Sequence, residues 1–303
     1  MKIDALWLRA NVIKAVRNFF WERGFLEVET PLLIPANAPE EHINPVVTLP
    51  SAWQLQTSPE ICMKRLLCNG HQRVFQISRC WRADERGSRH LSEFTMLEWY
   101  RANADYHTLM TDCEELLQYV ATSCLPNDRY FSRNSVKIDP FAPWLRISVQ
   151  EAFFRFGQVN VCDCIKEGRY EEILTAVIEP AISQYSTPVI LIDYPVELAA
   201  LARTKPENRE SAERFELYLG GLELANGFSE LTDPVEQRAR FEAANRMRRG
   251  FGQPELPLPE PFLNSLGAMP ESAGIAMGID RLVMLAAGAE AIDDVVAFTP
   301  EDL

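Results

Sequence analysis

The fold class of this chain follows from residues 74–100, which read VFQISRCWRADERGSRHLSEFTMLEWY. Residues 74–81 alternate apolar and polar side chains and are rich in residues that favour β-strands, as are residues 93–100. The loop between them, residues 82–92, is strongly charged. We therefore expect two strands that pair as one long antiparallel hairpin.

A second hairpin is predicted where Gly220-Gly221 separates two further strands, residues 214–219 and 222–225. Strands joined by hairpins, with helices around them, predict an α+β fold with a largely antiparallel sheet, and we expect residues 1–303 to form a single domain. Further strands are predicted at residues 25–30, 53–57, 189–193 and 273–277, helices at residues 4–23, 61–67, 105–121, 148–156, 169–184, 234–249 and 280–287, and proline-rich loops at residues 35–52 and 254–261.

The composition is that of a globular protein, with 303 residues of which 47% are apolar and 24% charged. The sequence has no run of 18 apolar residues, and its start does not have the pattern of a secretory signal, so we expect a cytoplasmic protein without a membrane partner. The net charge is −13, from 43 acidic and 30 basic residues. This charge argues against a free-standing nucleic-acid binder and favours a protein or small-molecule partner.

The seven cysteines are odd in number and scattered, which is typical of reduced thiols in a chain without a signal peptide. Cys162 and Cys164 are the one close pair. A single intervening residue, with no second pair of similar spacing, is only a weak signal for zinc. We predict no zinc site there.

The loop of the long hairpin concentrates basic side chains, namely Arg82, Arg86, Arg89 and His90. Guanidinium groups bind phosphate oxygens in a bidentate manner, so a cluster held between two strands suits a polyphosphate. The alternative reading of the same composition is a solvated, charged hairpin tip.

Glu216 and Glu223 lie seven residues apart across the Gly220-Gly221 turn. Carboxylates on adjacent paired strands could share a hard cation such as Mg²⁺, which prefers oxygen ligands. The alternative is a pair of exposed glutamates at a strand edge.

Two further segments combine unusual groups. Residues 223–230, ELANGFSE, bring carboxylates, an amide and an aromatic ring together around a glycine, and such groups can bind an ammonium. Residues 274–281, GIAMGIDR, predict a buried strand that passes through Gly278 into a helix, with Arg281 near the helix start. Ordinary core and turn structure is the alternative for both.

Taken together, these segments resemble the signatures of class II aminoacyl-tRNA synthetases, and more narrowly those of lysyl-tRNA synthetases. Residues 24–31 resemble motif 1, residues 75–100 motif 2 and residues 278–282 motif 3. The resemblance covers residues 8–121 and 209–300. It implies the catalytic domain of that class, an antiparallel sheet flanked by helices, and a homodimer formed through motif 1.

The resemblance implies ATP and Mg²⁺ as cofactors. Activation joins a carboxylate to the α-phosphate, and the developing negative charge needs fixed cations. Arg82 would hold the α-phosphate and the attacking carboxylate, and Arg281 would contact the γ-phosphate, so both would be catalytic. Arg281 would also cover one face of adenine, with Phe94 on the other. Glu216 and Glu223 would hold the metal. The implied ATP-binding set is Arg82, Asp84, Arg89, His90, Phe94, Glu216, Glu223 and Arg281.

The resemblance also implies an amino-acid pocket. Glu60 would take the α-amino group and Asn226 the carboxylate. Glu230 would bind the distal ammonium, because a buried ammonium without a carboxylate partner is costly. The implied substrate-binding set is Ser58, Glu60, Glu98, Tyr100, Glu223, Asn226, Phe228, Glu230 and Ala276.

Within this class, the chain resembles the elongation factor P–lysine ligases, which are truncated lysyl-tRNA synthetase paralogs. It begins almost at motif 1, so we expect no N-terminal anticodon-binding OB-fold, and tRNA is not an expected partner. The run Glu98-Trp99-Tyr100-Arg101, and Ala276 in place of a glycine, are similar to that family. The resemblance implies activation of lysine or (R)-β-lysine and its transfer to a lysine side chain of elongation factor P.

Three departures bear on the substrate: Cys62, Asp84 and Leu91-Ser92 replace residues that are usual in these families. Two other readings stay open. One is a tRNA-independent ligase with another acceptor, and the other is a catalytically silent synthetase-like subunit. The presence of both arginines, Arg82 and Arg281, and of both metal-binding carboxylates argues against the silent subunit.

Overall fold

The computed structural model describes residues 2–125 and 129–303. Within these residues eight strands form one sheet, and Arg73–Trp81 (β4) and Glu93–Ala102 (β5) form the long hairpin inside it. In spatial order the strands are β1 (Leu26–Glu27), β4, β5, β12 (Ser272–Gly278), β11 (Leu222–Ser229), β10 (Ser211–Leu219), β9 (Val189–Pro195) and β8 (Leu145–Ser148). Two pairs, β1 with β4 and β8 with β9, are parallel, and the others are antiparallel. The predicted α+β class with a largely antiparallel sheet is confirmed.

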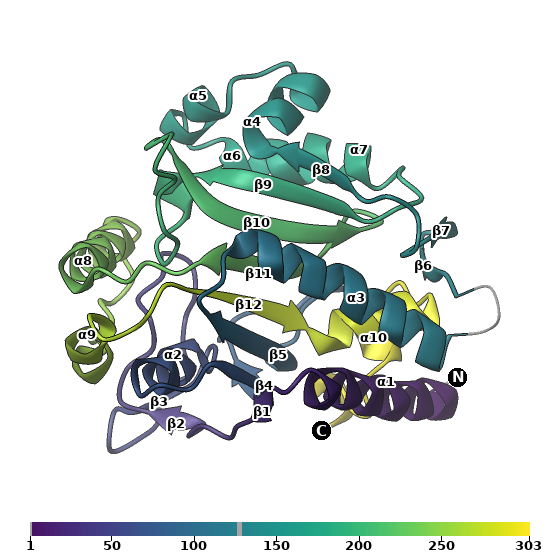
Figure 1. Ribbon diagram of the computed structural model, residues 1–303, viewed down its shortest axis with the longest axis horizontal. Coiled ribbons are helices and arrows are strands. Elements are labelled where there is room, and N and C mark those ends of the chain that lie inside the picture. Colours follow the sequence, from purple (N-terminus) through teal and green to yellow (C-terminus); the bar gives the residue numbers. More distant parts are fainter. Residues whose placement is uncertain (1, 126–128) are drawn as a thin grey trace.

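Three helices bury one face of this sheet. Figure 1 shows α3 (Tyr106–Cys124) lying across the strands, with α1 (Lys2–Glu22) and α10 (Ile279–Ala287) beside it. Along β5 the odd-numbered residues Leu97 and Trp99 point into this core. The even-numbered residues of β5 therefore point to the opposite face, because side chains alternate along a strand.

The opposite face is only partly covered. Helices α2 (Glu60–Cys68), α8 (Pro234–Gly250) and α9 (Glu260–Leu266) pack near one end of it, in a core that includes Val74 of β4 and Tyr100 of β5. The middle of this face carries polar groups. The helices predicted at residues 4–23, 61–67, 105–121, 234–249 and 280–287 correspond to α1, α2, α3, α8 and α10.

Residues 149–182 add a second layer at the far edge of the sheet, at the top of Figure 1. Short helical segments pack on β8 and β9 around a separate core that includes Phe153, Tyr170 and Tyr194. The segments are α4 (Val149–Ala152), a π-helical turn (Phe153–Gly157), α5 (Val161–Lys166), α6 (Tyr170–Ile173), a second π-helical turn (Leu174–Ile178) and α7 (Glu179–Ile182). The predicted helices at 148–156 and 169–184 are thus broken into shorter pieces, and the sequence analysis missed α5, β8 and the small hairpin of β6 (Phe131–Arg133) and β7 (Val136–Ile138).

Two local predictions need correction. The strand expected at residues 53–57 is only β3 (Gln54–Leu55), and it pairs with β2 (Leu33–Ile34) outside the main sheet. The segment 254–261, predicted as a loop, already contains the start of α9. Pro259 and Pro261 lie at the helix start, where the backbone N–H that a proline lacks would have no partner within the helix. No helix among the described residues is long and apolar enough to cross a bilayer. All seven cysteines are free thiols.

Candidate active site

The strand register aligns a row of polar residues across the open face of the sheet. Glu98 of β5 pairs with Ala276 of β12, Ala276 pairs with Asn226 of β11, and Asn226 pairs with Glu216 of β10. Directly paired residues of antiparallel strands project to the same face. The candidate residues of four strands therefore meet in one place, although they are far apart in the sequence.

A cavity of about 220 Å³ opens beside this row, under the loop of the β4–β5 hairpin. Most of the predicted ATP-binding residues line it, together with the predicted carboxylate-binding amide. The predicted residues in its wall are Arg82, Arg89, His90, Phe94, Glu223, Asn226, Ala276 and Arg281. Arg82 and Arg89 of the hairpin loop therefore share one cavity with Arg281, whereas Arg86 is outside its lining and pairs with Asp293 and Glu301.

Arg82 and Arg281 are held differently. The guanidinium of Arg82 lies 5.2 Å from the centre of the Phe94 ring, and its buried Nε has no hydrogen-bond partner among the described residues. Arg281 follows Asp280, whose carboxylate accepts from the backbone N–H of Thr95 at 2.6 Å and so fixes the start of α10. Arg281 itself donates to the carbonyl of Glu223 at 2.8 Å.

His90 lies against Arg281, with 2.6 Å between Nε2 of His90 and Nη2 of Arg281. Burial, reinforced by the positive charge of Arg281, lowers the pKa of His90. The imidazole is therefore neutral at physiological pH and accepts from the guanidinium. The pair forms one donor surface facing the cavity.

Two of the predicted ATP-binding residues, Glu216 and Asp84, do not line this cavity. Asp84 lies in the loop of the hairpin. Its side chain is exposed, and its backbone has a left-handed φ of 66°. The neighbouring Glu85 lines the cavity instead and lies 3.8 Å from Arg82. The turn therefore decides which carboxylate of the loop faces the cavity.

Glu216 and Glu223 project to the same face but differ in their surroundings. Glu216 is buried and accepts from Tyr194 and Tyr218 at 2.6 Å each, and from Arg214 at 2.5 Å. Glu223 is partly exposed and lies 3.3 Å from Arg281. Within the described residues, no group of three or more His, Cys, Asp or Glu side chains is arranged to hold a metal. A divalent ion here would need phosphate oxygens or water to complete its coordination.

Arg214 also determines how Asn226 can act. Its Nε donates to Oδ1 of Asn226 at 3.0 Å. The amide oxygen is therefore occupied by a donor, and the Nδ2 donors remain for a ligand. This orientation suits the capture of a carboxylate, as the resemblance predicted for Asn226.

The predicted amino-acid residues form a buried cluster of carboxylates beyond the cavity. Glu98 accepts from Ser58 at 2.5 Å and from Tyr100 at 2.8 Å. Burial raises the pKa of Glu98 to about 8, and burial also raises the pKa of Glu230 to about 8. Both carboxyl groups can therefore bind a cation, because a positively charged ligand would favour their ionised forms.

Lys64 is the residue of this cluster that the sequence analysis missed. Its Nζ lies 2.5 Å from Oε1 of Glu60 and 2.5 Å from Oε2 of Glu230, and 5.1 Å from the centre of the Phe228 ring. The spacing of four residues between Glu60 and Lys64 on one helix could have indicated the first pair. Nothing local indicates the second.

Small residues make room at the centre of the cluster. Gly274 pairs with Tyr100 on one side and Phe228 on the other. A Cβ at this position would lie 2.2 Å from the Tyr100 ring and 2.4 Å from Oε1 of Glu230. Only glycine therefore lets the tyrosine ring and the carboxylate approach each other. Ala276, two residues on, lies between this cluster and the cavity.

Glu40 is a second missed residue. It lines the cavity from the loop between β2 and β3, and burial raises its pKa to about 7 despite the nearby charge of Arg82. The sequence analysis assigned residues 35–52 to a loop without function. The loop composition alone held no signal, because the position of Glu40 depends on the tertiary packing.

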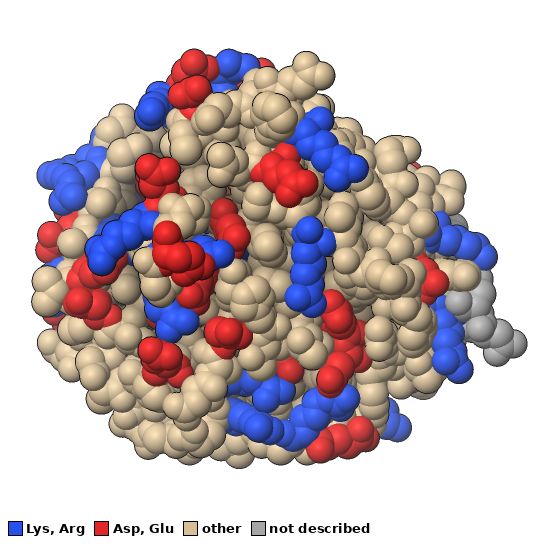
Figure 2. All heavy atoms as spheres, turned by 45° about the horizontal axis from the view of Figure 1, so that its top comes forward, with Lys and Arg blue, Asp and Glu red and all other residues tan. Residues whose placement is uncertain are grey.

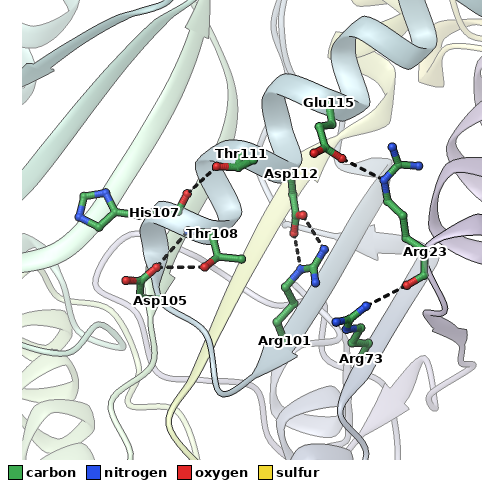
Figure 3. Close-up of a pocket in the computed structure, with 9 residues that line it drawn as sticks. All are labelled: Arg23, Arg73, Arg101, Asp105, His107, Thr108, Thr111, Asp112 and Glu115. Atoms are coloured by element: carbon green, nitrogen blue, oxygen red, sulfur yellow. Dashed lines mark hydrogen bonds and ion pairs between the residues drawn. The ribbon is translucent and has the colours of Figure 1, made fainter.

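A second, wider depression of about 610 Å³ lies at the other end of the β4–β5 hairpin. Figure 3 shows that its arginines face partners within the depression. Arg101 forms two hydrogen bonds with Asp112, at 2.7 and 2.6 Å, and Arg23 donates to Glu115 at 3.1 Å. Two of the three arginines are thus paired with carboxylates, and Arg73 donates to the backbone carbonyl of Arg23. The cavity under the hairpin loop, which gathers the predicted site residues, is the better candidate.

Comparison with known proteins identifies the class. The chain matches the family described as tRNA synthetases class II (D, K and N) over residues 3–302, and it belongs to this family. Proteins named "Elongation factor P--(R)-beta-lysine ligase" from Salmonella gallinarum and Proteus mirabilis are each 41% identical to it, over 98% of this chain and 95% of theirs. The protein of that name from Mannheimia succiniciproducens is 40% identical over the same shares. The predicted resemblance and the predicted class, an amino-acid ligase on a class II synthetase domain, are confirmed.

Proposed function

We propose that this protein activates lysine or (R)-β-lysine with ATP and transfers it to a lysine side chain of elongation factor P. The observation that carries the proposal is the junction of two unlike sites on one sheet face. A cavity into which Arg82, Arg89 and Arg281 converge adjoins a buried cluster of carboxylates that includes Glu98 and Glu230. The names of the relatives support elongation factor P as the acceptor.

The chemistry needs two steps. A carboxylate oxygen of the amino acid attacks the α-phosphorus of ATP, and the bond to the bridging oxygen breaks to release pyrophosphate. The amine of the acceptor then attacks the carbonyl carbon, loses a proton and expels AMP. Arg82 and Arg281 would stabilise the charge that develops on the phosphate oxygens in the first step. No side chain of this chain has to act as a nucleophile.

In this proposal the nucleotide residues act by position. Arg82 faces the α-phosphate and Arg281 the outer phosphates, with Arg89 and His90 beside them, while Phe94 offers a ring to the adenine. Mg²⁺ would neutralise the triphosphate. Glu223 is the carboxylate open to the cavity, whereas the oxygens of Glu216 already accept three donors, so we assign Glu223 the direct contact and Glu216 an orienting role.

The amino acid would span the row from Asn226 to Glu230. The Nδ2 donors of Asn226 would hold its carboxylate, while Glu60 and Glu98 would meet the nearer ammonium. Oε1 of Glu230 has no hydrogen-bond partner among the described residues and would receive the distal ammonium. Ser58, Tyr100, Phe228 and Ala276 would complete the walls of the pocket.

We also propose a homodimer through motif 1. Large apolar side chains that are exposed in the single chain gather on α1, β1 and β2, and they include Trp7, Trp21 and Leu26 at 71%, 53% and 50% exposure. Such a surface is typical of an interface. Sedimentation of the wild type against Trp7→Asp tests this, and a monomeric wild type would refute it.

A tRNA partner is not part of the proposal. On the face shown in Figure 2, Lys and Arg side chains lie among Asp and Glu side chains rather than in one broad basic surface. Together with the net charge of −13, this favours a protein acceptor. We place the reaction in the cytoplasm, because it consumes ATP.

The decisive experiment incubates the protein with ATP, labelled (R)-β-lysine or labelled lysine, and purified elongation factor P. We expect label on the factor, and none on a factor whose acceptor lysine is replaced by arginine. Adenylate formation without transfer would remove the assigned acceptor and leave an amino-acid-activating enzyme. A lack of amino-acid-dependent ATP–pyrophosphate exchange would refute the enzyme itself.

A further inference from the structure

Lys64 is a cation sealed inside the amino-acid end of the site. Its side chain is 1% exposed, and both of its close partners are carboxylates, Glu60 and Glu230. Although burial alone would lower the pKa of Lys64, the charges of Glu230 and then Glu60 raise it above its usual value. Lys64 is thus held in its protonated form, because its two carboxylate partners offset the cost of burying its charge.

Each element that packs on the cluster contributes charged or polar side chains near Lys64. Helix α2 contributes Glu60 and Lys64, β5 contributes Glu98 and the neutral Tyr100, and Glu230 directly follows the end of β11. The remaining neighbour is the carboxylate of Glu40, which also interacts with Glu60 and Lys64 but has Arg82 as its strongest charged partner.

Glu40 is counted with Arg82 and not with the cluster. When fully ionised, the cluster then holds the carboxylates of Glu60, Glu98 and Glu230 and the ammonium of Lys64. Its net charge is then −3 + 1 = −2. A diamino acid whose carboxylate is held elsewhere brings two ammonium groups, a charge of +2. Without Lys64 the ionised cluster would carry three negative charges. With Lys64 it carries two, which the two ammonium groups of such a ligand can neutralise.

The contacts of Glu230 show how the lysine shares this carboxylate with a ligand. Lys64 takes Oε2, while Oε1 points towards Gly274 and has no hydrogen-bond partner among the described residues. The two oxygens are thus divided between a resident cation and an incoming one. Phe228 closes the site over the lysine.

We propose that Lys64 is a positioning residue that serves as a built-in third cation, holding Glu60 and Glu230 in place for the two ammonium groups of a diamino acid. This inference rests on the proposed function, because it assumes that the cluster receives the substrate. Lys64 does not touch the reacting carboxylate or phosphate. It acts through the two glutamates.

The test compares wild type, Lys64→Met, Lys64→Arg and a surface control, Lys166→Met. Methionine preserves the length of the side chain and removes the charge, whereas arginine keeps the charge. Lys166 lies exposed at the end of α5. Binding of (R)-β-lysine and of lysine is measured by calorimetry from pH 6.5 to 9.5, with ATP binding measured in parallel.

We expect Lys64→Met to weaken diamino-acid binding by about 30-fold or more near pH 7.5, the loss typical of breaking a buried charge pair. ATP affinity should change little. The loss should shrink towards pH 9.5, because glutamates without the lysine ionise only at higher pH. Lys64→Arg should recover part of the affinity, and Lys166→Met should match the wild type.

Three results would overturn the inference: a folded Lys64→Met variant with unchanged binding, a loss that is equal at every pH, or an equal loss of ATP affinity. A wild type that binds the diamino acid but shows no exchange would refute the proposed function alone, while the variants still test Lys64. A wild type that binds no diamino acid would refute both. If Lys64→Met does not fold, the pH dependence of Lys64→Arg decides, since it should match the wild type only if charge is what matters.

Discussion

The two ends of the site stabilise charge in opposite ways. At the nucleotide end, Arg82, Arg89 and Arg281 have side chains 25%, 40% and 18% exposed, and their acidic partners lie 3.3–3.8 Å away. At the amino-acid end, Lys64 and Glu230 are 1% and 0% exposed and lie 2.5 Å apart. The nucleotide end is partly exposed to solvent and its ion pairs are long, whereas the amino-acid end is buried and its ion pair is short.

This difference matches the tasks of the two ends. A triphosphate is large and strongly charged, so several partly exposed guanidinium groups suffice to hold it. Discrimination among amino acids requires that a wrong ligand leave a buried polar group unpaired, which demands a dry, fully partnered pocket. The first end should therefore govern rate and the second end should govern specificity, and the following experiments test that division.

The largest effect is expected for Arg82→Ala at the nucleotide end. Loss of a group that stabilises transition-state charge should lower ATP–pyrophosphate exchange by about 10³-fold. Because Arg82 contributes little to the core, the melting temperature should stay within a few degrees of wild type. Arg79→Ala is the matched control, since Arg79 is 51% exposed on β4, the strand that leads into Arg82, and its exchange rate should not change. Equal losses in both variants would contradict a specific role for Arg82.

At the amino-acid end, Glu230→Gln should raise the KM for the diamino acid about 100-fold and leave the KM for ATP nearly unchanged, because a buried ammonium loses its ionised partner. Steady-state exchange kinetics measure both constants. Glu271→Gln, at a glutamate that is 79% exposed, is the control. A parallel rise in both KM values would show that the two ends do not act separately.

The buried carboxylates at the amino-acid end should also make the free energy of unfolding depend on pH. The pKa of Glu98 is about 8 in the folded protein, above its ordinary value of 4.5, so the folded state binds the extra proton between these values. Stability is therefore lost as pH rises from about 4.5 to 8, by at most about 1.4 kcal/mol per pH unit for one group.

Thermal denaturation of Glu98→Gln without ligand measures this effect. The variant should melt near wild type at pH 5 and a few degrees higher at pH 8.5, and a saturating diamino acid should stabilise the wild type more than the variant. Identical pH profiles for both proteins would remove Glu98 as the source.

The smallest effect is expected for Glu179→Gln. Glu179 of α7 lies 3.3 Å from Arg89, and this partly exposed pair joins the added layer to the hairpin loop. Such pairs are worth about 0–1 kcal/mol, so the KM for ATP should change less than about fivefold. If Glu179→Gln changed the KM for ATP by as large a factor as Arg82→Ala lowers exchange, the hairpin loop would be held as rigidly as the amino-acid end.

The sequence was most informative where the chemistry is local. Alternation in residues 74–100 predicted the central hairpin, and the glycine between a strand and a helix placed Arg281 near the start of α10. Resemblance in the motifs indicated the family. Residues 129–200 were poorly predicted, because their short segments bury apolar residues in a separate core without a clear period.

What the sequence by itself determined is the set of charged groups and the strands and helices that carry most of them. Only the tertiary structure decided which of these groups meet. Glu98, Ala276 and Asn226 become neighbours through strand register, and Lys64 reaches Glu230 through the packing of α2 on the sheet. Turn geometry likewise turned Asp84 outward and Glu85 inward. Charge pairing acts through space over a few ångströms, so neither residue spacing nor composition could have specified it.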